Sequence, residues 1–423
     1  MTEFTYPTPP RTLEDTGLST DYLIRLMTKI MNAGGTMTPT QISAEIKLPK
    51  SLVNLLIKEM TRLLLVESQG LVSEDIKSDI RYTLTDRGSK WALEALMFSQ
   101  YVGPAPVTLE MFDHQTRTQS IRHETLHPDD LKTGLSHLVL PDGIMNQVGP
   151  AANSARSVLL WGEPGNGKTS IAEALGKAFH DIVYLPYAII VGNQIIKFFD
   201  ETLHEVAETD EAMSPPLDQR WLPCRRPVVI TGGELTLEML DLMFEPQARF
   251  YEAPMHMKAL GGVFVIDDFG RQTTTPREFL NRWIVPLEKG FDMLSLHTGK
   301  KFQVPFDQLV MFSTNMRPEE LSDEAALRRI YFKIYIPTPT REDYLQIFRD
   351  VVEARAIPMA DNVLEDFYRD VYEGMELVPS GAHPGFLVDH ITSACAYLDR
   401  EVEVTRDLLD IAWRNVVAAK RTM

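Results

Sequence analysis

Short hydrophobic runs recur along the chain from about residue 131, and each is bounded by glycine, proline or aspartate. Segments with apolar residues at helical spacing separate these runs. This alternation is typical of a mostly parallel β-sheet whose faces are covered by helices. The five clearest runs are SVLLWGEP, PVVITGG, GGVFVIDD, QLVMFSTN and IYFKIYIP. The pattern therefore predicts an α/β domain over residues 131–338.

The first hundred residues follow a different pattern, in which three amphipathic stretches come first. The stretch at 21–33 stops at Gly34 and Gly35, and TPTQISAEI and KSLVNLLIKEMTRLL continue as two further helices. Two strand-like runs then precede a last helix from about Ser89 to Phe98. Three helices, a β wing and a closing helix resemble a winged helix-turn-helix domain over residues 21–100, after a tail at 1–20.

The remaining segments connect or decorate these two units. Residues 101–130 begin with YVGPAPVTL and continue as a polar stretch, so we expect a linker. From residue 339 to 423 about four amphipathic helices follow without strands, which predicts a small all-α lid. Gly192 and Asn193, inside YLPYAIIVGNQIIKFF, predict a hairpin inserted into the α/β domain.

The segment GEPGNGKT fits the phosphate-binding pattern G-x-x-x-x-G-K-[ST]. A strand-like run precedes it and a helical one follows, which is the context that this chemistry requires. Backbone N–H groups converge on phosphates there, Lys168 reaches the β and γ oxygens, and Thr169 ligates Mg²⁺. We therefore expect ATP and Mg²⁺ as cofactors. The expected nucleotide contacts are Gly162, Glu163, Pro164, Gly165, Asn166, Gly167, Lys168, Thr169 and Ser170.

Polar residues follow two of the later strands and precede a third. Asp267 and Asp268 end GGVFVIDD. As consecutive residues at a strand end they are expected to point to opposite sides, the first carboxylate toward Mg²⁺ and the second toward a water. Asn315 ends the next strand, where an amide can hold the attacking water, although a turn-forming role is the alternative. Arg328 and Arg329 stand directly before the last strand. Such a pair either faces a neighbouring subunit's γ-phosphate or belongs to a solvated, ion-paired surface.

Together these residues resemble an AAA+ ATPase from about residue 131 to the C-terminus. The resemblance implies Walker A at 162–169, Walker B at Asp267 and Asp268, sensor 1 at Asn315, an arginine finger and a helical lid. For the finger we prefer Arg329, with Arg328 as the alternate. It also implies a ring-shaped homo-oligomer, with a hexamer as the expected size.

Two segments indicate a subgroup. MKALGGVFVIDD is similar to the approach to Walker B in MoxR-like ATPases, magnesium chelatases and MCM helicases. DMLSLHTGKKFQVPFD predicts a hairpin before sensor 1, which marks that subgroup and commonly faces the central pore. Phe244, Phe250 and Tyr251 are candidates for the pore lining, with burial in a core as the alternative.

The sequence departs from the AAA+ pattern at two places. The expected position of a sensor 2 arginine, SGAHPGFLVDH, offers His383 and no arginine. Asp268 replaces the usual glutamate of Walker B and is one methylene shorter, and a displacement of about 1 Å can cost ~10²-fold in a catalytic step. Because Lys168, Thr169, Asp267 and Asn315 are all retained, we predict a working but slow ATPase.

Charge and composition limit the classes of binding partner and the cellular location that we expect. The net charge is −17, of which residues 1–105 carry only −1, and this balance opposes non-specific nucleic-acid binding. No apolar run approaches the ~18 residues of a membrane span, and the start lacks signal-peptide features, so we expect a cytoplasmic protein without membrane insertion. Cys224 and Cys395 are the only cysteines, which suggests neither a disulfide framework nor a zinc site.

The N-terminal module leaves two docking modes open. Its predicted recognition helix is locally basic, and Asn54 has the chemistry to read a base edge. The wing, LVSEDIKSDI, is acidic at Glu74, Asp75 and Asp79, which favours protein docking or dimerisation. The basic residues in and beside the helix are Lys47, Lys50, Lys58 and Arg62.

From these features we predict an ATPase that remodels a protein complex, as MoxR-like chaperones do. One alternative is a DNA-acting AAA+ ATPase of the helicase-loader or transposition-helper kind. Another is a nucleotide-gated module that assembles with ATP but scarcely turns over.

Overall fold

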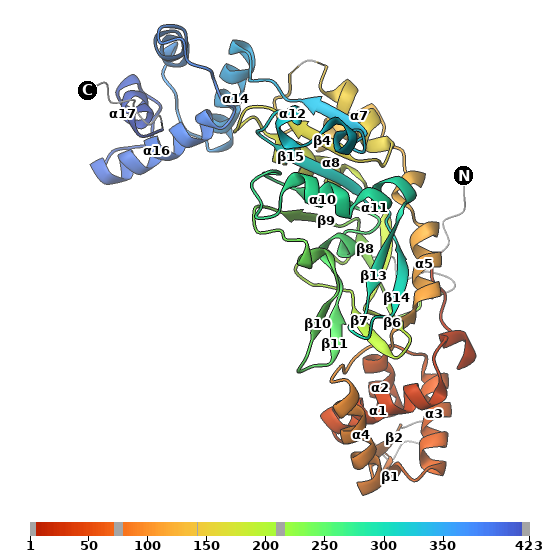
Figure 1. Cartoon of the computed structure of the whole chain (residues 1–423). Coiled ribbons are helices and arrows are strands. Elements are labelled where there is room, and N and C mark those ends of the chain that lie inside the picture. The colour runs from red at the N-terminus through yellow and green to blue at the C-terminus, as the bar shows by residue number, and fades with distance from the viewer. Residues whose placement is uncertain (1–5, 72–78, 142, 209–215, 417–423) are drawn as a thin grey trace.

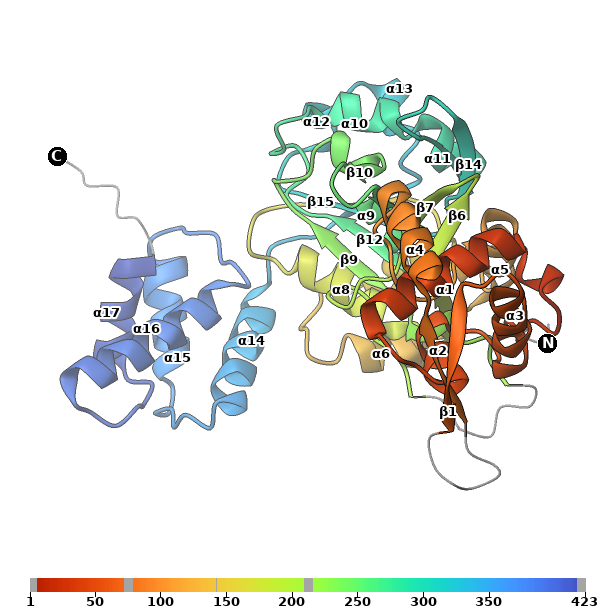
Figure 2. The same cartoon turned by 90° about the horizontal axis from the view of Figure 1, so that it is seen from below.

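The predicted parallel sheet forms the middle of an elongated molecule, with helical parts at both ends (Figure 1). A computed structural model of the chain describes residues 6–71, 79–141, 143–208 and 216–416. Viewed from below, the C-terminal helices form a group of their own beside the rest of the molecule (Figure 2). Within the described ranges, no helix is both long and apolar enough to cross a bilayer.

The central sheet has five parallel strands in the order β16-β4-β15-β12-β9. Alternate side chains of these strands enter two hydrophobic cores, one on each face of the sheet. Burial on both faces explains why the runs are apolar without interruption. The strands are β4 Val158–Trp161, β9 Val228–Thr231, β12 Val263–Ile266, β15 Leu309–Thr314 and β16 Phe332–Tyr335.

Helices cover both faces of this sheet. One core contains residues of α6 Pro128–Gly134, α7 Met145–Asn153 and α8 Lys168–Ala178. The other face packs against η3 Glu238–Leu240, α9 Met255–Lys258, α10 Pro276–Arg282, α11 Ile284–Lys289, α12 Pro318–Leu321 and α13 Glu324–Leu327. The expected α/β class with a parallel sheet is confirmed.

A second five-stranded sheet, in the order β10-β11-β7-β6-β3, joins this domain to the N-terminal part. The hairpin predicted at Gly192 and Asn193 is confirmed as β6–β7, and its role is larger than decoration, because Ala188 and Ile195 enter the N-terminal core. The strands are β3 Val107–Thr108, β6 Ala188–Val191, β7 Gln194–Lys197, β10 Met243–Glu245 and β11 Phe250–Glu252.

The segment 101–130, which we expected to be a linker, is folded. It contains β3, α5 Leu109–Thr118 and η2 Ile121–His123, and it leads into α6. Val107 and Phe112 are buried in the core beneath the second sheet. Polar composition suggested an open connection, but these few apolar residues anchor the segment.

Two further antiparallel strand pairs, of which only the second is a hairpin, pack against the second sheet. β5 Ile182–Pro186 pairs with β8 Trp221–Arg225, and β13 Phe291–Ser295 pairs with β14 Lys301–Pro305. The second pair confirms the hairpin predicted before sensor 1. A hydrogen bond joins the tip of this hairpin to β11, because the Tyr251 hydroxyl accepts from the backbone N–H of His297 at 2.9 Å.

The N-terminal elements occur in the predicted order. They are η1 Glu14–Thr16, α1 Thr20–Gly34, α2 Pro39–Ile46, α3 Lys50–Arg62, β1 Val66–Leu71, β2 Ile80–Leu84 and α4 Asp86–Phe98. β1 and β2 are antiparallel, while Glu74 and Asp75 of the expected wing lie outside the described residues. The winged-helix assignment itself stays a prediction.

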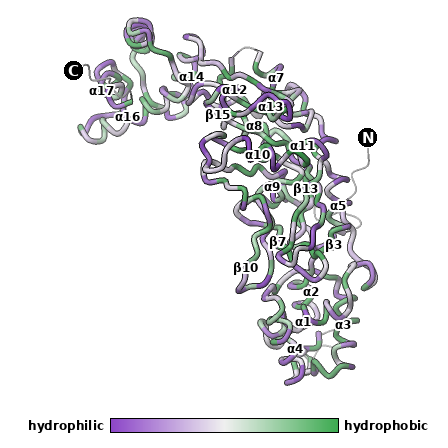
Figure 3. The backbone as a smooth tube through the Cα atoms, viewed as in Figure 1, coloured by the Kyte–Doolittle hydropathy of each residue, from purple (hydrophilic) through white to green (hydrophobic). Residues whose placement is uncertain are grey.

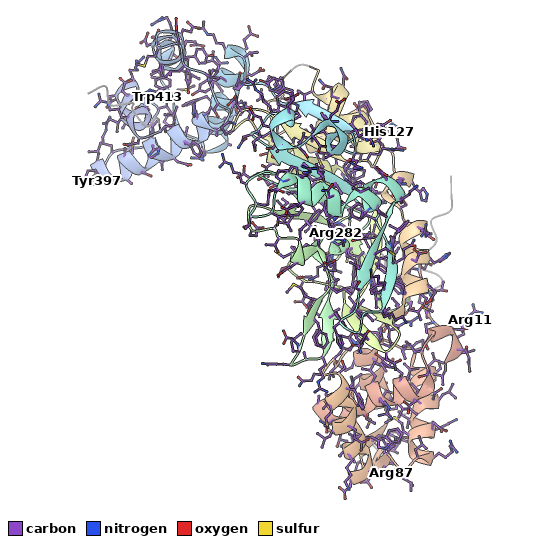
Figure 4. The ribbon with its side chains drawn as sticks, in the orientation of Figure 1. Arg11, Arg87, His127, Arg282, Tyr397 and Trp413 are labelled. Atoms are coloured by element: carbon purple, nitrogen blue, oxygen red, sulfur yellow. The ribbon has the colours of Figure 1, made fainter. Side chains whose placement is uncertain are left out.

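The C-terminal part contains the four predicted helices and a π-helical turn. They are α14 Arg341–Ala354, α15 Val363–Tyr368, η4 Arg369–Glu373, α16 His383–Leu398 and α17 Arg406–Val416. Their apolar faces form a core of their own. Trp413 lies among these helices, whereas Tyr397 projects from the outer end of α16 (Figure 4). Hydrophobic and hydrophilic stretches alternate along the backbone of all parts, as several separate cores require (Figure 3).

Candidate active site

The predicted site residues meet at one edge of the central sheet, where its parallel strands end. β4 leads into the loop 162–167, and α8 begins at Lys168 directly after Gly167, whose φ of 80° is left-handed. Asp267 follows β12 and Asn315 follows β15. Because carboxyl ends of parallel strands share an edge, distant segments of the chain converge here.

Lys168 is the most buried charged group of the site, with 6% of its surface exposed. Its ammonium donates hydrogen bonds to the carbonyls of Gly162 and Glu163, both at 2.9 Å, and to Asn315 Oδ1 at 2.6 Å. Burial lowers the pKa of Lys168, and the nearby carboxylates of Asp267 and Asp268 oppose that change. The cation is therefore held at the mouth of the phosphate loop.

Thr169 and Asp267 form a set of hard oxygen ligands. The Thr169 hydroxyl lies 2.9 Å from each carboxylate oxygen of Asp267. Hydroxyl, carboxylate and water oxygens are the ligands that Mg²⁺ prefers. These two residues therefore fit the predicted magnesium site.

Asp268 is exposed and lies beside Asn315, whose side-chain nitrogen donates to Asp268 Oδ1 at 3.4 Å. We expected the two aspartates to alternate as strand residues do, and this geometry is wrong. β12 ends at Ile266, and the backbone N–H of Phe269 returns to the Ser313 carbonyl at 2.7 Å. This turn gives Asp268 a left-handed φ of 49°, yet the carboxylates still separate toward Thr169 and Asn315.

A cavity of about 760 Å³ opens at these residues, a size typical of small-molecule sites. Residues 164–170 line it together with Asp267, Asp268 and Asn315, while Gly162 and Glu163 contribute only through their bonds to Lys168. The lining also includes residues 137–141 and, from α14, Ile347, Asp350 and Val351. The lining thus combines polar groups of the kind that a nucleotide's phosphates require with apolar side chains that suit its base.

The C-terminal helices close one side of the cavity directly on the phosphate loop. Ser380 Oγ donates to the Pro164 carbonyl at 3.3 Å, and the Gly381 N–H donates to Asn166 Oδ1 at 3.2 Å. Gly165 has φ 79°, and a Cβ there would collide with Ser380 Oγ. The glycine thus permits both the loop turn and the close approach of the lid.

His383, the residue at the expected sensor 2 position, does not line the cavity. It lies within the lid, where Nδ1 is 2.8 Å from the Tyr372 hydroxyl and the ring contacts Trp413. Burial lowers the pKa of His383, which favours a neutral ring. His383 therefore does not stand at the cavity, where a sensor arginine was expected.

Arg271 is a cavity residue that the sequence interpretation missed. It lines the same cavity as Lys168, three residues after Asp268, and its backbone N–H donates to the Asp268 carbonyl at 2.9 Å. No arginine of the described lid residues lines the cavity. The signal was available in the sequence FGRQ, but only the turn after β12 shows that this side chain faces the site.

The two finger candidates differ in their surroundings. Arg329 Nε lies 3.3 Å from Glu288 Oε1, and 16% of its side chain is exposed. Arg328 is exposed and forms no side-chain ion pair with any described residue. Neither residue lines the cavity of its own chain. A role across a subunit boundary remains a prediction for both.

The aromatic candidates for a pore pack against hydrophobic cores, although Phe244 and Phe250 are only half-buried. Tyr251 is buried, and its ring centroid lies 4.9 Å from that of Phe244. Phe250 packs edge-on against Tyr101 at 6.1 Å. These contacts favour the core role that the sequence left open.

Comparison with known proteins adds to this geometry. A family described as a domain of unknown function (DUF8689) matches residues 340–415, the C-terminal helices. Spastin from Danio rerio is 23% identical over 262 residues, which cover 61% of this chain and 37% of spastin. The chain thus matches little more than a third of spastin's length.

Two solved structures give further likenesses. NtrX from Brucella abortus in complex with ATP is 16% identical with a TM-score of 0.40, covering 64% of this chain and 56% of NtrX. The RuvB Holliday junction branch migration motor from Thermotoga maritima is 12% identical with a TM-score of 0.37, covering 65% and 68%. The phosphate loop, the parallel sheet and the spastin alignment together give this chain an AAA+ ATPase-like fold.

Proposed function

We propose that the protein is an ATPase that uses ATP hydrolysis to remodel a protein complex. The observation that carries the proposal is the convergence of Lys168, Thr169, Asp267, Asp268 and Asn315 on one cavity. These groups are of the kinds that bind a triphosphate and hold a water. A glycine-rich turn with only a structural role does not require that these residues, which come from three strand ends, lie together.

In the proposed reaction, the oxygen of a water attacks the γ-phosphorus, the bond to the β–γ bridging oxygen breaks, and ADP and phosphate leave, while a proton of the water passes to the Asp268 carboxylate. Asp268 and Asn315 are adjacent and hold the water, while Lys168 exchanges its loop carbonyl partners for β and γ oxygens. Thr169, beside Asp267, would hold Mg²⁺, which when bound would neutralise charge on the phosphates. Arg271 adds a second cation at the cavity and compensates for the missing lid arginine.

A second subunit is expected to complete the site. Arg329→Ala should leave ATP binding unchanged but lower turnover by about 10²-fold or more, since a finger stabilises only the transition state. Phosphate release and nucleotide titration measure the two effects. Arg328→Ala is the matched control and should turn over as the wild type does. If Arg328→Ala loses turnover and Arg329→Ala does not, Arg328 is the finger.

Mixed assemblies separate a role in trans from a local one. Rings that combine Arg329→Ala subunits with Lys168→Ala subunits should recover part of the activity, because some interfaces then pair an intact loop with an intact arginine. No recovery at any ratio, in rings shown to be mixed, contradicts a finger in trans.

Protein rather than DNA is the proposed substrate because the basic helix of the N-terminal part is partly neutralised. Lys50 pairs with Asp79 at 2.6 Å and Arg62 pairs with Glu59 at 2.5 Å. Lys58 and Asn54 remain exposed, and this is the feature that favours the DNA alternative. The N-terminal core also includes residues of the second sheet, so the test needs the whole chain.

The test uses full-length Asp268→Asn, loaded with ATP, as a trap. We expect it to retain a defined protein partner that Lys168→Ala, which cannot load ATP, does not retain. Duplex DNA should bind the full chain weakly, and Lys58→Glu should change that binding by less than about twofold. Tight DNA binding that falls steeply with salt, together with no ATP-dependent protein partner, favours the DNA-acting alternative.

A further inference from the structure

A second cavity lies where the N-terminal part, the second sheet and α9 meet. Its volume is about 670 Å³, close to that of the nucleotide cavity and typical of ligand-binding sites. The lining comes mainly from the segment after α4, the segment after β7, and β10, β11 and α9. Nothing in the proposed ATPase reaction uses this cavity.

One wall of the cavity is a face of the second sheet. Met243 of β10 is opposite Glu252 of β11, and Glu252 is opposite Lys197 of β7, so these three side chains lie side by side. Tyr251 and Ile196, their neighbours along the strands, point to the other face and are buried in the core there. The cavity therefore lies on the face of the sheet that points away from this core.

A buried cation at this wall is neutralised by carboxylates. Lys258, whose side chain is 8% exposed, donates to Asp200 Oδ2 at 2.8 Å and to Glu252 Oε2 at 3.5 Å. Lys197 lies 3.4 Å from Glu252 Oε1. Burial opposes the ionisation of Asp200, but hydrogen bonds from Lys258 and Thr202 hold its pKa well below the usual range. Both lysines of the lining are thus already paired.

Glu201 is the carboxylate of the lining that is left over. The lining has three carboxylates against two lysines, and Glu201 forms no ion pair with a described residue. Its charge acts inside the cavity, because burial raises the pKa of Tyr187 and the charges of Cys224 and Glu201 add to that rise. A cation is the complement of this excess negative charge.

Two aromatic rings of the lining accompany this carboxylate. The rings of Tyr187 and Phe199 meet at 63° with their centroids 5.7 Å apart, and both residues are half-buried. The Tyr187 hydroxyl has no hydrogen-bond partner among the described residues, and the protein does not enclose it. Ring faces and a carboxylate together attract an ammonium or guanidinium group more strongly than an exposed charge alone.

Exposed apolar residues extend from the cavity toward α4. Met243 and Val102 of the lining are exposed, and so are Met97 and Phe98 at the end of α4, the latter at 77%. The turn between β10 and β11 reaches this helix, where the Arg249 side chain donates to the Met97 carbonyl (Figure 1). An apolar surface of this extent, bordered by charges, is typical of an interface with another protein.

We propose that this cavity is the docking site for a protein segment that presents an arginine or lysine between two apolar side chains. The cation lies at Glu201 against the faces of Tyr187 and Phe199, and the apolar side chains pack on the methionines of the lining. Methionine is unbranched and flexible, so it adapts to different apolar partners. These methionines are Met239, Met243 and Met255.

The cavity gives the proposed ATPase a place to hold its protein substrate, and this step rests on the proposed function. Met239 and Met255 line the cavity and also pack against the core on one face of the central sheet. The same core contains Ile266, the last residue of β12, which directly precedes Asp267. A docked segment thus contacts the side-chain layer that supports the strand before the two site aspartates.

The probe is the capped tripeptide acetyl-Leu-Arg-Leu-amide, which contains one cation between two apolar side chains. Calorimetric titration of the full chain, up to about 5 mM peptide, should show one saturable site per chain. Acetyl-Leu-Glu-Leu-amide and acetyl-Ser-Arg-Ser-amide, which each lack one of the two features, should bind at least about tenfold more weakly. Absence of saturable binding overturns the proposal, and so does equally tight binding of ethylguanidinium, which would make this a site for a small cation.

Variants of Glu201 test the charge. Glu201→Gln keeps the shape of an exposed side chain and should weaken the probe at least about fivefold without changing the thermal unfolding temperature. Glu110→Gln, at an exposed glutamate of α5 that does not line the cavity, should bind the probe as the wild type does. Glu201→Lys gives the lining an excess of one positive charge and should prefer acetyl-Leu-Glu-Leu-amide. The same preference in Glu201→Lys as in the wild type contradicts the assigned charge.

A pair of methionine variants tests the apolar contact. Met243→Ser should weaken the probe at least about threefold, because it removes an apolar side chain from the lining. Met293→Ser, at an exposed methionine of β13 that does not line the cavity, is the control and should leave binding unchanged. Wild-type affinity in Met243→Ser would show that the peptide binds elsewhere.

The substrate role is decided separately with the ATP-loaded Asp268→Asn trap. A protein that the trap retains should be displaced by saturating acetyl-Leu-Arg-Leu-amide and not by acetyl-Leu-Glu-Leu-amide. Retention that the first peptide does not change overturns the substrate role alone. If the wild type has no turnover and the trap retains nothing, the proposed ATPase function fails, while the titrations still decide whether the cavity binds the peptide.

Discussion

Replacing Lys168 with alanine is expected to abolish ATP binding by the full chain. The ammonium group donates to two loop carbonyls and to Asn315, so it is aimed from the first residue of α8 at the position of the β and γ phosphates. Apart from Arg271, it is the only Lys or Arg among the described residues that line the cavity. The Lys168→Ala change therefore removes the buried cation that contacts the phosphate loop.

Calorimetric or fluorescence titration with ATP measures this effect. We expect affinity to fall by at least about 10²-fold, since a buried charge-assisted contact with a phosphate contributes several kcal/mol at such a site. Lys177→Ala, on the last turn of the same helix and exposed, is the control and should bind as the wild type does. Unchanged affinity in Lys168→Ala would remove the phosphate-loop assignment.

How far the sequence predicts the site depends on how local each signal is. The loop 162–169 and its flanking strand and helix are contiguous, so spacing alone predicts them. Asp267 and Asn315 could be placed because each follows a buried strand, and parallel strands end at one edge. The contact between Lys168 and Asn315 then follows from sheet order rather than from any sequence motif.

The parts that escaped prediction depend on contacts between distant segments. β3 has two residues and acquires its strand form only by pairing with β6, so 107–108 carried no periodic signal. The contact between Ser380 and Pro164 joins residues 216 positions apart. Asp268 was assigned a strand geometry because the end of β12 is set by a bond from Phe269 to Ser313, which no local pattern records.

Asp268→Asn is expected to stop hydrolysis while ATP and magnesium binding persist. Asparagine has the same shape and tolerates the left-handed backbone at this position, but it cannot accept a proton from water. Turnover should fall by about 10²- to 10⁴-fold, the usual contribution of a general base. Asp267→Asn is the matched comparison, because its carboxylate contacts Thr169 and its loss should weaken magnesium binding as well.

Asp268→Glu addresses why an aspartate stands where AAA+ proteins commonly have glutamate. With φ at 49°, the backbone favours aspartate or asparagine over longer side chains, and a residue forced into this region costs about 1–2 kcal/mol. The short side chain thus belongs to the turn that also places Asn315 beside it at 3.4 Å. We therefore expect Asp268→Glu to bind ATP normally and to turn over no faster than the wild type in a phosphate-release assay. A faster Asp268→Glu enzyme would show that the turn adapts to glutamate and that the natural site is impaired. If instead the wild type hydrolyses no ATP and Asp268→Asn alters neither assembly nor turnover, a nucleotide-gated assembly module explains the same cavity better than a motor.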